Sequence, residues 1–252
     1  MCKGKIIFLY STSGLAEKPF LDAGYEVWSF DGQNQDENLC GGMWHKRWAW
    51  FEPEDLVGQA KRIVDTVQRT GGNERILLVV GFPECTHIAV SGSRHFKRKL
   101  AENPEIQNDA VKLARLVEVV GNVANCQWAA ENPVSVLATK WRKSDHTFEP
   151  YHYGGYLPED DVHPLYPEFI NARDAYPKKT CLWVGNGFIM PPKKTVDVPR
   201  RSDGSVAYSE QYQRLGGTSL KTKNIRSASP RGFFIALCEQ LERNYEMSTL
   251  PK

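Results

Sequence analysis

Short apolar runs rich in β-branched residues alternate along the chain with longer stretches in which apolar residues recur every three or four positions. Runs of the first kind predict buried strands, and the helical spacing predicts amphipathic helices. Strands are expected at residues 6–10, 26–31, 76–80, 126–130 and 180–184. Helices are expected at residues 15–23, 53–70, 103–120 and 232–245. This alternation predicts an α/β fold with a mostly parallel sheet and helices on both faces.

Three stretches interrupt the alternation. Residues 141–176 are rich in proline, tyrosine, histidine and acidic residues and show little periodicity, so a long irregular insertion with a functional role is expected there. Residues 193–231 carry nine basic and three acidic side chains, which predicts a loop facing a polyanion, with an ordinary solvent-exposed loop as the alternative. Residues 32–52 combine glycines, large aromatic residues and bases. Core packing of these aromatics is favoured there over a lid or a base-stacking surface.

The composition is that of an ordinary globular protein. The 252 residues are 41% hydrophobic and 25% charged, which is enough for one sizeable domain, expected to span residues 1–252. The formal net charge of +2 does not by itself indicate a nucleic-acid partner. The sequence shows no signal peptide or transmembrane span, so no membrane partner is expected.

The positions of the cysteines and histidines further limit the chemistry that is expected of the chain. The sequence has six cysteines and no C-x-x-C pair. This spacing argues against a zinc ribbon and against a disulfide framework, so reduced thiols and a cytoplasmic location are expected. The histidines His146, His152 and His163 lack the tight spacing of metal ligands, and no metal site is expected.

Cys85 is the first candidate for chemistry. It ends a Gly-Phe-Pro-Glu-Cys sequence that begins at Gly81, directly after the strand expected at 76–80. The carboxyl ends of parallel strands are where open α/β sheets bind ligands. A thiol at this position, near the N-terminus of a following helix, can have a lowered pKa and act as a nucleophile. An inert buried cysteine is the alternative.

The first 31 residues predict a nucleotide-type βαβ unit. The first strand is followed by a turn of small residues, and the second strand ends in Asp31. Small residues allow a ligand to approach the backbone, and a terminal carboxylate can accept hydrogen bonds from ribose hydroxyls. Of the glycine fingerprint only Gly14 is present, so an ordinary βαβ turn is an equally good interpretation.

Two further segments supply candidates near Cys85. The sequence Glu131-Asn132-Pro133 follows the strand expected at 126–130, so Glu131 is expected at the same edge of the sheet. A basic cluster that includes Arg94 and Lys97 comes just after the Cys85 loop. These bases can bind phosphate, or they can form a solvated helix face.

In this order the motifs resemble the DNA cytosine-5-methyltransferases, especially the short forms found in phages and prophages. The matching segments touch most of the chain and comprise residues 9–14 with Asp31, 81–85 with 90–92, 131–133, 176–183 and 225–233. The ordered set of Pro-x-Cys, Ser-Gly and Glu-Asn-Pro is the most specific part. The resemblance implies a Rossmann-like methyltransferase fold that binds S-adenosyl-L-methionine and transfers its methyl group to C5 of cytosine in DNA.

The resemblance also implies residue roles. A Cys85 thiolate would add to cytosine C6, and Glu131 would stabilise or protonate the ring near N3. Asn132 would hold the loop, whereas Lys178 and Lys179 stand where the family usually has arginines that position the base and the loop. The residues implied for cofactor binding are Tyr10, Ser11, Thr12, Ser13, Gly14, Asp31, Gly81, Pro83 and Ser227. Those implied for contact with DNA, with the target base flipped out of the duplex, are Ser91, Arg94, Lys97, Lys221, Lys223 and Arg226.

Two departures from the family pattern change the expectation. Glu84 separates Pro83 from Cys85, and a carboxylate beside a thiol opposes thiolate formation unless it points away or is paired. Only residues 185–224 stand where full-length members insert a target-recognition domain. With the insertion at 141–176 they would form a reduced recognition region, which predicts short or relaxed site specificity. Modification of a pyrimidine nucleotide or of RNA, and a catalytically inactive nucleic-acid-binding protein, remain alternatives.

Overall fold

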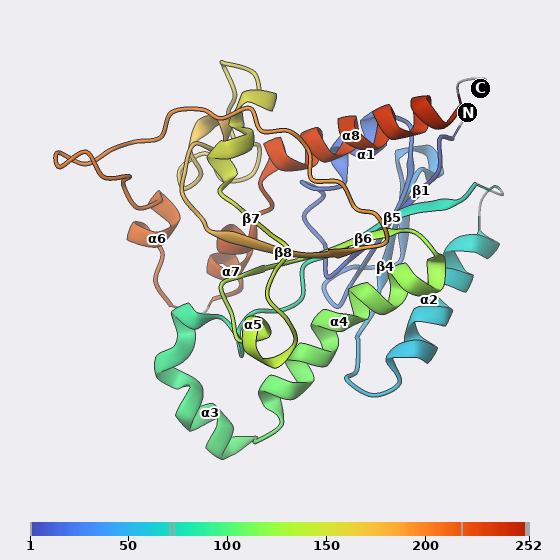
Figure 1. Cartoon of the computed structure of the whole chain (residues 1–252), viewed down its shortest axis with the longest axis horizontal. Coiled ribbons are helices and arrows are strands. Elements are labelled where there is room, and N and C mark those ends of the chain that lie inside the picture. The colour runs from blue at the N-terminus through green and yellow to red at the C-terminus, as the bar shows by residue number, and fades with distance from the viewer. Residues whose placement is uncertain (1, 71, 73, 218, 250–252) are drawn as a thin grey trace. The chain divides into compact units, whose positions relative to one another are not determined.

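The structure, a computed structural model, describes residues 2–70, 72, 74–217 and 219–249, with side chains up to residue 244. It has an α/β fold (Figure 1). The chain divides into two compact units. The first unit consists of Met1–Thr12, Phe20–Thr147 and Thr180–Phe188, and the second of Ser13–Pro19, Phe148–Lys179 and Ile189–Lys252. The second unit therefore contains most of the insertion expected at 141–176 and all of the basic stretch at 193–231.

The strands of the described residues form one eight-stranded sheet, which belongs to the first unit apart from Phe148. In their order across the sheet the strands are β3 (Glu37–Leu39), β4 (Trp44–Trp48), β2 (Glu26–Asp31), β1 (Lys5–Leu9), β5 (Ile76–Gly81), β6 (Gln127–Pro133), β8 (Thr180–Gly185) and β7 (His146–Phe148).

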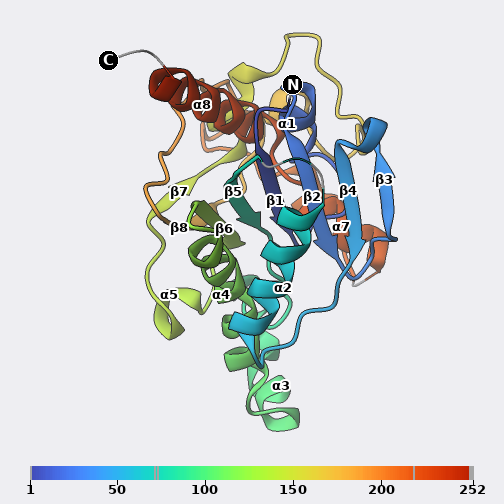
Figure 2. The same cartoon turned by 90° about the vertical axis from the view of Figure 1, so that its right-hand side faces the viewer.

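Most neighbouring strands are parallel. β1 pairs with β2 on one side and with β5 on the other, and β2 and β5 pair in turn with β4 and β6, all in parallel. β3 runs antiparallel to β4, and β8 runs antiparallel to β6. The chain thus builds the sheet outward from β1, first in one direction and then in the other (Figure 2). The strand order consequently reverses between β1 and β5.

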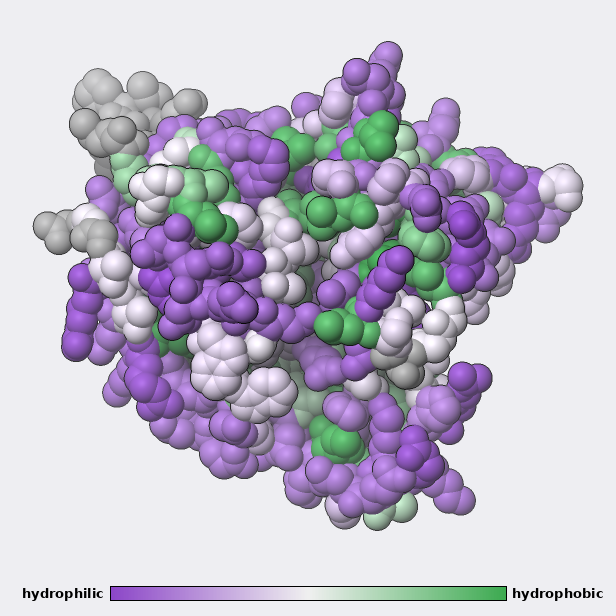
Figure 3. Space-filling view, turned by 180° about the vertical axis from the view of Figure 1, so that it is seen from behind, coloured by the Kyte–Doolittle hydropathy of each residue, from purple (hydrophilic) through white to green (hydrophobic). Residues whose placement is uncertain are grey.

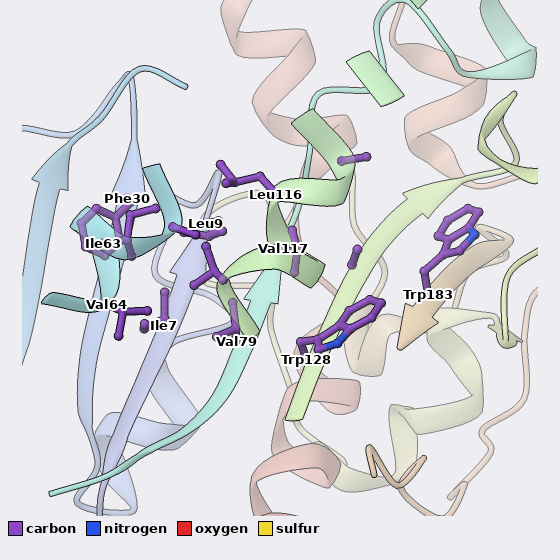
Figure 4. Packing of buried hydrophobic residues seen from close by; sticks show 14 of the residues in the cluster. Ile7, Leu9, Phe30, Ile63, Val64, Val79, Leu116, Val117, Trp128 and Trp183 are labelled. Atoms are coloured by element: carbon purple, nitrogen blue, oxygen red, sulfur yellow. The ribbon is translucent and has the colours of Figure 1, made fainter. Parts of the chain in front are cut away.

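Two amphipathic helices, α2 (Leu56–Arg69) and α4 (Ile106–Ala124), cover one face of this sheet (Figure 2). Alternation along β1 directs Ile7 to this face, where it joins Ile63 of α2 and Val117 of α4 in one buried cluster (Figure 4). Removal of this apolar surface from water is the main stabilising contribution to the first unit.

Close approaches complete the packing of the first unit. A Cβ atom on Gly121 would lie 2.5 Å from Cδ1 of Trp128, so only glycine lets α4 approach β6 this closely. On the opposite face of the sheet, Phe8 packs edge-on against Phe20 of α1 (Lys18–Asp22), with ring centroids 5.7 Å apart.

A buried ammonium group fixes β1 to the end of α2. Lys5 has no exposed surface, and its Nζ donates to the carbonyl oxygens of Val67, Thr70 and Gly72 at 2.8, 2.8 and 2.9 Å. These carbonyls lie at or just beyond the C-terminus of the helix, where they lack partners within it and where the helix dipole favours a positive charge. The cost of burying the charge is thereby offset by three hydrogen bonds.

The second unit is built largely from helical turns and irregular chain. Apart from Lys18 and Pro19 of α1, its helical segments are the 3₁₀ helices η3 (Pro150–Tyr156) and η4 (Ala172–Asp174) and the α-helices α6 (Glu210–Arg214), α7 (Leu220–Ser227) and α8 (Arg231–Thr249). Phe148 stacks on Phe233 of α8 with ring centroids 4.4 Å apart, and Tyr153 of η3 packs edge-on against the same ring at 5.1 Å. These rings form an apolar centre of the unit.

Buried charges tie α8 to the irregular chain of the second unit. The Arg231 guanidinium donates to both carboxylate oxygens of Asp161 at 2.7 Å and to Asp174 Oδ1 at 3.3 Å. Asp161 also accepts from the Arg173 N–H, and Asp174 from the Gly232 N–H. Burial raises the pKa of Asp161, but its hydrogen bonds from Arg231 and Arg173 outweigh burial and hold that pKa below its ordinary value. At Asp174 burial dominates, and the pKa is raised.

His163 gives the second unit an expected dependence on pH. Its ring is buried, and Nδ1 accepts hydrogen bonds from the N–H groups of Leu165 and Tyr166 at 3.3 and 2.9 Å. Burial, followed by the charge of Arg231, lowers the pKa of His163 from 6.5 to about 4. The unfolded chain therefore binds a proton in a pH range in which the folded unit does not. Stability is expected to fall by up to about 3 kcal/mol as the pH drops through this range.

Replacing His163 with asparagine, whose side-chain oxygen can accept from the same N–H groups, is expected to flatten this pH dependence. The measurement is the free energy of unfolding by denaturant at about pH 7 and about pH 4.5, followed by circular dichroism. The variant His95→Asn, at an exposed position, should retain the wild-type dependence. Equal pH dependence in His163→Asn and the wild type would contradict the assignment.

The structure confirms most of the expected elements. The five expected strands are present as β1, β2, β5, β6 and β8, and the helices expected at 53–70, 103–120 and 232–245 are present as α2, α4 and α8 with shifted ends. The helix expected at 15–23 is shorter, because the chain forms turns up to Glu17 and becomes helical only at Lys18, next to Pro19. The stretch 193–231, expected as a loop, contains α6 and α7.

Residues 32–52 contain elements that the pattern did not indicate. They form β3, the 3₁₀ helix η1 (Cys40–Gly42) and β4. The expectation that the aromatics of this stretch pack in the core is wrong for Trp48 and Trp50, whose exposed fractions are 61% and 69%. Trp48 is the last residue of β4, and Trp50 follows in the loop after this strand.

The face seen in Figure 3 is predominantly hydrophilic, with hydrophobic residues scattered between. Among the described helices, none has both the length and the apolar character that crossing a membrane requires.

Candidate active site

The carboxyl ends of four parallel strands bring several of the expected site residues to one edge of the sheet. Leu9 of β1 pairs with Phe30 of β2 and with Gly81 of β5, and Gly81 pairs with Ala130 of β6. The residues that follow these positions, at the same level of the edge, are Tyr10, Asp31, Phe82 and Glu131. The strand order reverses here between β1 and β5, and open α/β sheets bind ligands at such a point.

Hydrogen bonds join the loop after β5 to the loop after β6. Asn132, which is 1% exposed, donates through Nδ2 to the carbonyl of Pro83 at 2.8 Å. Further along, residues 88–90 and 134–136 run antiparallel and form two backbone hydrogen bonds of 2.9 and 3.0 Å. The loop that carries Cys85 is therefore fixed against the loop that begins at Glu131, although the two residues are far apart in the sequence.

Cys85 lies in a tight turn of this loop. It is half-buried against the core of the first unit, and its carbonyl accepts from the N–H groups of Ile88 and Ala89 at 3.1 and 2.8 Å. Residues 82–95 are all described, and the first helix among them is the 3₁₀ helix η2 (Val90–His95). The expected helix N-terminus beside the thiol is therefore wrong, because the chain forms a turn and pairs with residues 134–136 before any helix begins.

Glu131 and Asn132 point to different faces of the sheet. Side chains alternate along a strand, so Asn132 lies on the same face as Trp128 and Ala130 of the buried cluster, and Glu131 lies on the opposite face. Glu131 is half-buried and pairs in register with Leu182 of β8. Asn132 is thus placed to hold the backbone of the Cys85 loop, while the Glu131 side chain is directed to the other face of the sheet.

Replacing Asn132 with alanine is expected to loosen the Cys85 loop. The change removes the hydrogen bond to the buried Pro83 carbonyl, at a cost of about 1–3 kcal/mol. Hydrogen exchange in residues 82–90, and the rate at which iodoacetamide labels Cys85, should both rise severalfold. Peptide mapping distinguishes Cys85 from the other thiols. The variant Asn122→Ala, at an exposed position of α4, is the control, and equal labelling rates in the two variants would contradict the role of Asn132.

Glu84 accepts a hydrogen bond from a neighbouring side chain, and its negative charge affects the pKa of Asp31. Its Oε1 accepts from the hydroxyl of Thr86 at 2.6 Å. Asp31 is half-buried, and its Oδ1 accepts from the Gln33 N–H at 2.7 Å. Burial raises the pKa of Asp31 above its ordinary value, the Gln33 N–H opposes this, and the negative charge of Glu84 adds to it. The residue that departs from the family pattern therefore places a second carboxylate near the end of β2.

Tyr10 and Ser11 form the turn after β1. Tyr10 has a positive φ of 59°, which is uncommon for a large side chain. Its hydroxyl donates to the carbonyl of Leu113 in α4 at 2.8 Å, and burial followed by the charge of Asp31 raises its pKa far above the ordinary value. The Tyr10 ring therefore packs in the core. Ser11 is buried, and its carbonyl accepts from Asn34 Nδ2 at 3.1 Å.

A hollow of about 210 Å³ opens beside these strand ends in the first unit. Its lining residues come from β2, from the end of β4 and the chain after it, and from α2, and they are Phe30, Trp48, Ala49, Trp50, Phe51, Gln59, Arg62, Ile63 and Thr66. Aromatic walls with a few polar groups are typical of sites for flat rings. Neither Cys85 nor Glu131 lines this hollow.

The bases expected to contact DNA in the first unit lie on the surface after the Cys85 loop. Ser91 and Arg94 lie in η2, and Lys97 in α3 (Phe96–Glu102); all three are exposed. Lys99 of α3, a member of the same basic cluster, donates to the carbonyl of Thr86 at 2.6 Å. This contact places a positive charge beside the loop of Cys85.

The remaining expected site residues belong to the second unit. Lys178 donates its backbone N–H to Glu149 Oε2 at 2.6 Å, and the positive charge of Lys179 acts on the same carboxyl group, whose pKa burial nevertheless raises. Ser13 Oγ accepts from the Leu15 N–H at 3.3 Å. The others are Gly14, which has a positive φ of 79°, and the exposed α7 residues Lys221, Lys223, Arg226 and Ser227.

A group that could hold a metal ion lies at the opposite edge of the sheet. Cys2 Sγ and one carboxylate oxygen each from Glu26 and Glu74 lie within 4.8 Å of one another. These residues stand at the amino ends of β1, β2 and β5, away from the Cys85 loop. Their wide separation in the sequence is the reason that ligand spacing did not indicate them. The Cys2 thiol donates a hydrogen bond to the carbonyl oxygen of Gly4 at 3.3 Å.

The amino-acid sequence matches no protein-family model and no curated protein. The function is therefore inferred from the chemistry of the residues at the sheet edge.

Proposed function

We propose that this protein is an S-adenosylmethionine-dependent methyltransferase that acts on C5 of cytosine in DNA. The observation that carries the proposal is the attachment of the Cys85 loop to the Glu131–Asn132 loop at the point where the strand order reverses. A thiol and a carboxyl group thereby share one sheet edge with Asp31. This is the set of groups that addition to a pyrimidine ring beside a nucleotide-like cofactor requires.

The proposed reaction begins at the thiol. The Cys85 thiolate forms a bond to C6 of cytosine, and the C5–C6 π electrons shift to C5 while Glu131 donates a hydrogen bond or a proton at N3. C5 then carries the electron pair that forms the new bond to the methyl group. The bond between that methyl group and the sulfonium sulfur would break, its electron pair would stay on sulfur, and S-adenosylhomocysteine would leave. Loss of the C5 proton to solvent, return of any proton on N3 to Glu131 and departure of the thiolate from C6 restore the C5–C6 double bond. Since Cys85 and Glu131 approach from different faces of the sheet, the ring would lie across the sheet edge.

The residues at the ends of β1 and β2 fit S-adenosylmethionine. Asp31 Oδ1 is engaged by the Gln33 N–H, so its second oxygen can accept from a ribose hydroxyl. The aromatic hollow beside Asp31 suits a flat purine ring. When bound, the cofactor supplies a methyl group on a positively charged sulfur, and the carboxylates of Asp31 and Glu84 favour a cation here. Ser11 and Thr12 complete the turn, while the Tyr10 side chain supports it from the core.

A polynucleotide is favoured over a free nucleotide as the substrate. Arg94 and Lys97 are exposed next to the Cys85 loop, and α7 of the second unit presents Lys221, Lys223 and Arg226 to solvent. Binding of a mononucleotide would not require this many basic side chains, because it offers few phosphate contacts. The small size of the candidate recognition segments supports short or relaxed site specificity.

Transfer of a labelled methyl group tests the proposal. DNA, RNA of the same sequence and free dCMP are incubated separately with the protein and labelled S-adenosylmethionine, and the modified base is identified by digestion and mass spectrometry. We expect 5-methylcytosine in DNA only. Absence of transfer to all three substrates, together with absence of cofactor binding by calorimetry, would overturn the proposal.

A further inference from the structure

A surface of the second unit, formed by residues 200–217 and 219–226, carries exposed basic and aromatic side chains close together, and we call it the basic–aromatic surface. Its exposed bases are Arg200, Arg201, Arg214, Lys221, Lys223 and Arg226. Its acids are few and engaged: Asp203 accepts from the N–H and hydroxyl of Ser205, and Glu210 lies 3.8 Å from Arg214. The surface is therefore positively charged.

Two tyrosines lie among these bases. Tyr208 and Tyr212 are 57% and 65% exposed, and their ring centroids lie 5.0 Å apart with 40° between the ring planes. The Arg201 guanidinium lies 4.1 Å from the centroid of the Tyr208 ring. Rings with this exposure bury little apolar area, so they contribute little to the stability of the unit. They instead offer π-faces to a ligand, with a cation alongside.

Local hydrogen bonds hold the tyrosines in place. Helix α6 begins after Ser209, whose Oγ accepts from the Tyr212 N–H at 3.3 Å, and Gln213 Nε2 donates to the Tyr208 carbonyl at 2.7 Å. Gln211 of the same helix is buried. Because the backbone that carries both rings is fixed before any ligand binds, less ordering entropy is lost on binding.

Helix α7 and the preceding hairpin extend the charge of this surface. α7 packs against α6, with Thr222 and Ile225 buried and its basic residues exposed. Residues 200–206, closed by a bridge between Arg200 and Val206, project as a narrow hairpin before α6 (Figure 1). Cations therefore lie both before and after the tyrosine pair along the chain.

We propose that the basic–aromatic surface binds an unpaired DNA strand, with bases stacking on Tyr208 and Tyr212 and phosphates on the surrounding arginines and lysines. In a duplex the faces of the bases are covered by their neighbours, so the duplex can use only the cations of this surface. An unpaired strand can use both cations and rings. The inference rests on the proposed function, in which DNA is the substrate. It adds that this surface binds the DNA as an unpaired strand.

Fluorescence anisotropy with labelled oligonucleotides tests this inference. The full chain carrying Cys85→Ser is used without cofactor, so that binding does not depend on catalysis. We expect single-stranded DNA to bind about 10-fold or more tightly than the duplex of the same sequence. The double variant Tyr208→Ala/Tyr212→Ala should lose about 10-fold or more of the single-strand affinity and leave duplex affinity nearly unchanged. The variant Tyr208→Phe/Tyr212→Phe, which retains the rings, should bind as the parent does.

Variants of the cations separate charge from stacking. Lys221→Gln/Lys223→Gln should weaken the binding of single strand and duplex alike and reduce the salt dependence of both. Tighter binding of duplex than of single strand, equal single-strand affinity of the alanine variant and the parent, or tighter binding of RNA than of DNA would each overturn the inference. If the strand binds as expected but no substrate is methylated, the proposed function fails and this surface assignment stands. If DNA is methylated while the tyrosine variants bind normally, only the assignment fails.

Discussion

Replacing Cys85 with serine is expected to abolish both the covalent capture of DNA and methyl transfer. DNA that contains 5-fluorocytosine should trap the wild-type protein in the presence of S-adenosylmethionine, because fluorine at C5 cannot leave as a proton does and the thiolate then cannot depart. A serine hydroxyl stays protonated near neutral pH and adds poorly to C6, so turnover should fall by about 10³-fold or more. Denaturing gel electrophoresis measures the adduct, and transfer of a labelled methyl group measures turnover.

The matched control for this experiment is Cys40→Ser. Cys40 is exposed in η1 and lies outside the loops at the sheet edge, so its replacement should leave adduct formation and turnover at wild-type levels. Cofactor affinity measured by calorimetry should be the same in Cys85→Ser as in the wild type, which separates loss of chemistry from loss of folding. An adduct that forms with Cys85→Ser, or that maps to another cysteine, would show that Cys85 is not the nucleophile.

The sequence alone allowed the central sheet to be predicted, and the reason is burial. β1, β2 and β5 are central strands covered on both faces, so they appear as continuous apolar runs bounded by turn residues. The sheet edge shared by Cys85 and Glu131 followed from these strands, since parallel strands align their carboxyl ends. β4 could not be found in this way. Its Trp-His-Lys-Arg-Trp sequence buries only His45 and shows no apolar run.

Contacts between distant residues account for what the sequence did not indicate. Arg231 and Asp161 are 70 positions apart, and Arg231 and Asp174 are 57 apart, so no local periodicity relates them. The hydrogen bond from Asn132 to Pro83 likewise joins residues 49 positions apart. The sequence pattern placed both loops at one edge but did not reveal the bond that joins them. The pairing of Glu84 with Thr86 depends on the shape of the turn, which propensities do not determine.

Glu84 changes the electrostatics of the candidate site. A carboxylate next to a nucleophilic thiol opposes thiolate formation, but here its Oε1 is bound to the Thr86 hydroxyl and its charge raises the pKa of Asp31. Lys99, whose ammonium group reaches the Thr86 carbonyl, supplies a compensating charge beside the same loop. The departure from the family pattern is therefore compatible with a reactive Cys85, and it increases the negative charge near the end of β2, where a cationic cofactor would bind.

Replacing Arg231 with methionine is expected to destabilise the second unit by about 3–5 kcal/mol. Arg231 is buried and donates to both Asp161 and Asp174, so its removal leaves two buried carboxylates without their cation. Methionine retains much of the apolar side-chain volume, and the loss should therefore reflect charge more than packing. Hydrogen exchange followed by mass spectrometry should show lost protection in η3 and α8, whereas β1 and β5 of the first unit should stay protected.

The variant Arg243→Met provides the comparison on the same helix. Arg243 lies 3.6 Å from Glu239 in an exposed pair one helical turn apart, and pairs of this kind contribute at most about 0.5 kcal/mol. Equal protection in Arg231→Met and Arg243→Met would mean that the buried network does not hold the second unit together. A large loss in Arg231→Met alone would identify it as the main electrostatic link between α8 and the irregular chain. Asp161→Asn should then reproduce part of this loss, because its amide can still accept from the Arg173 N–H but no longer balances the guanidinium charge.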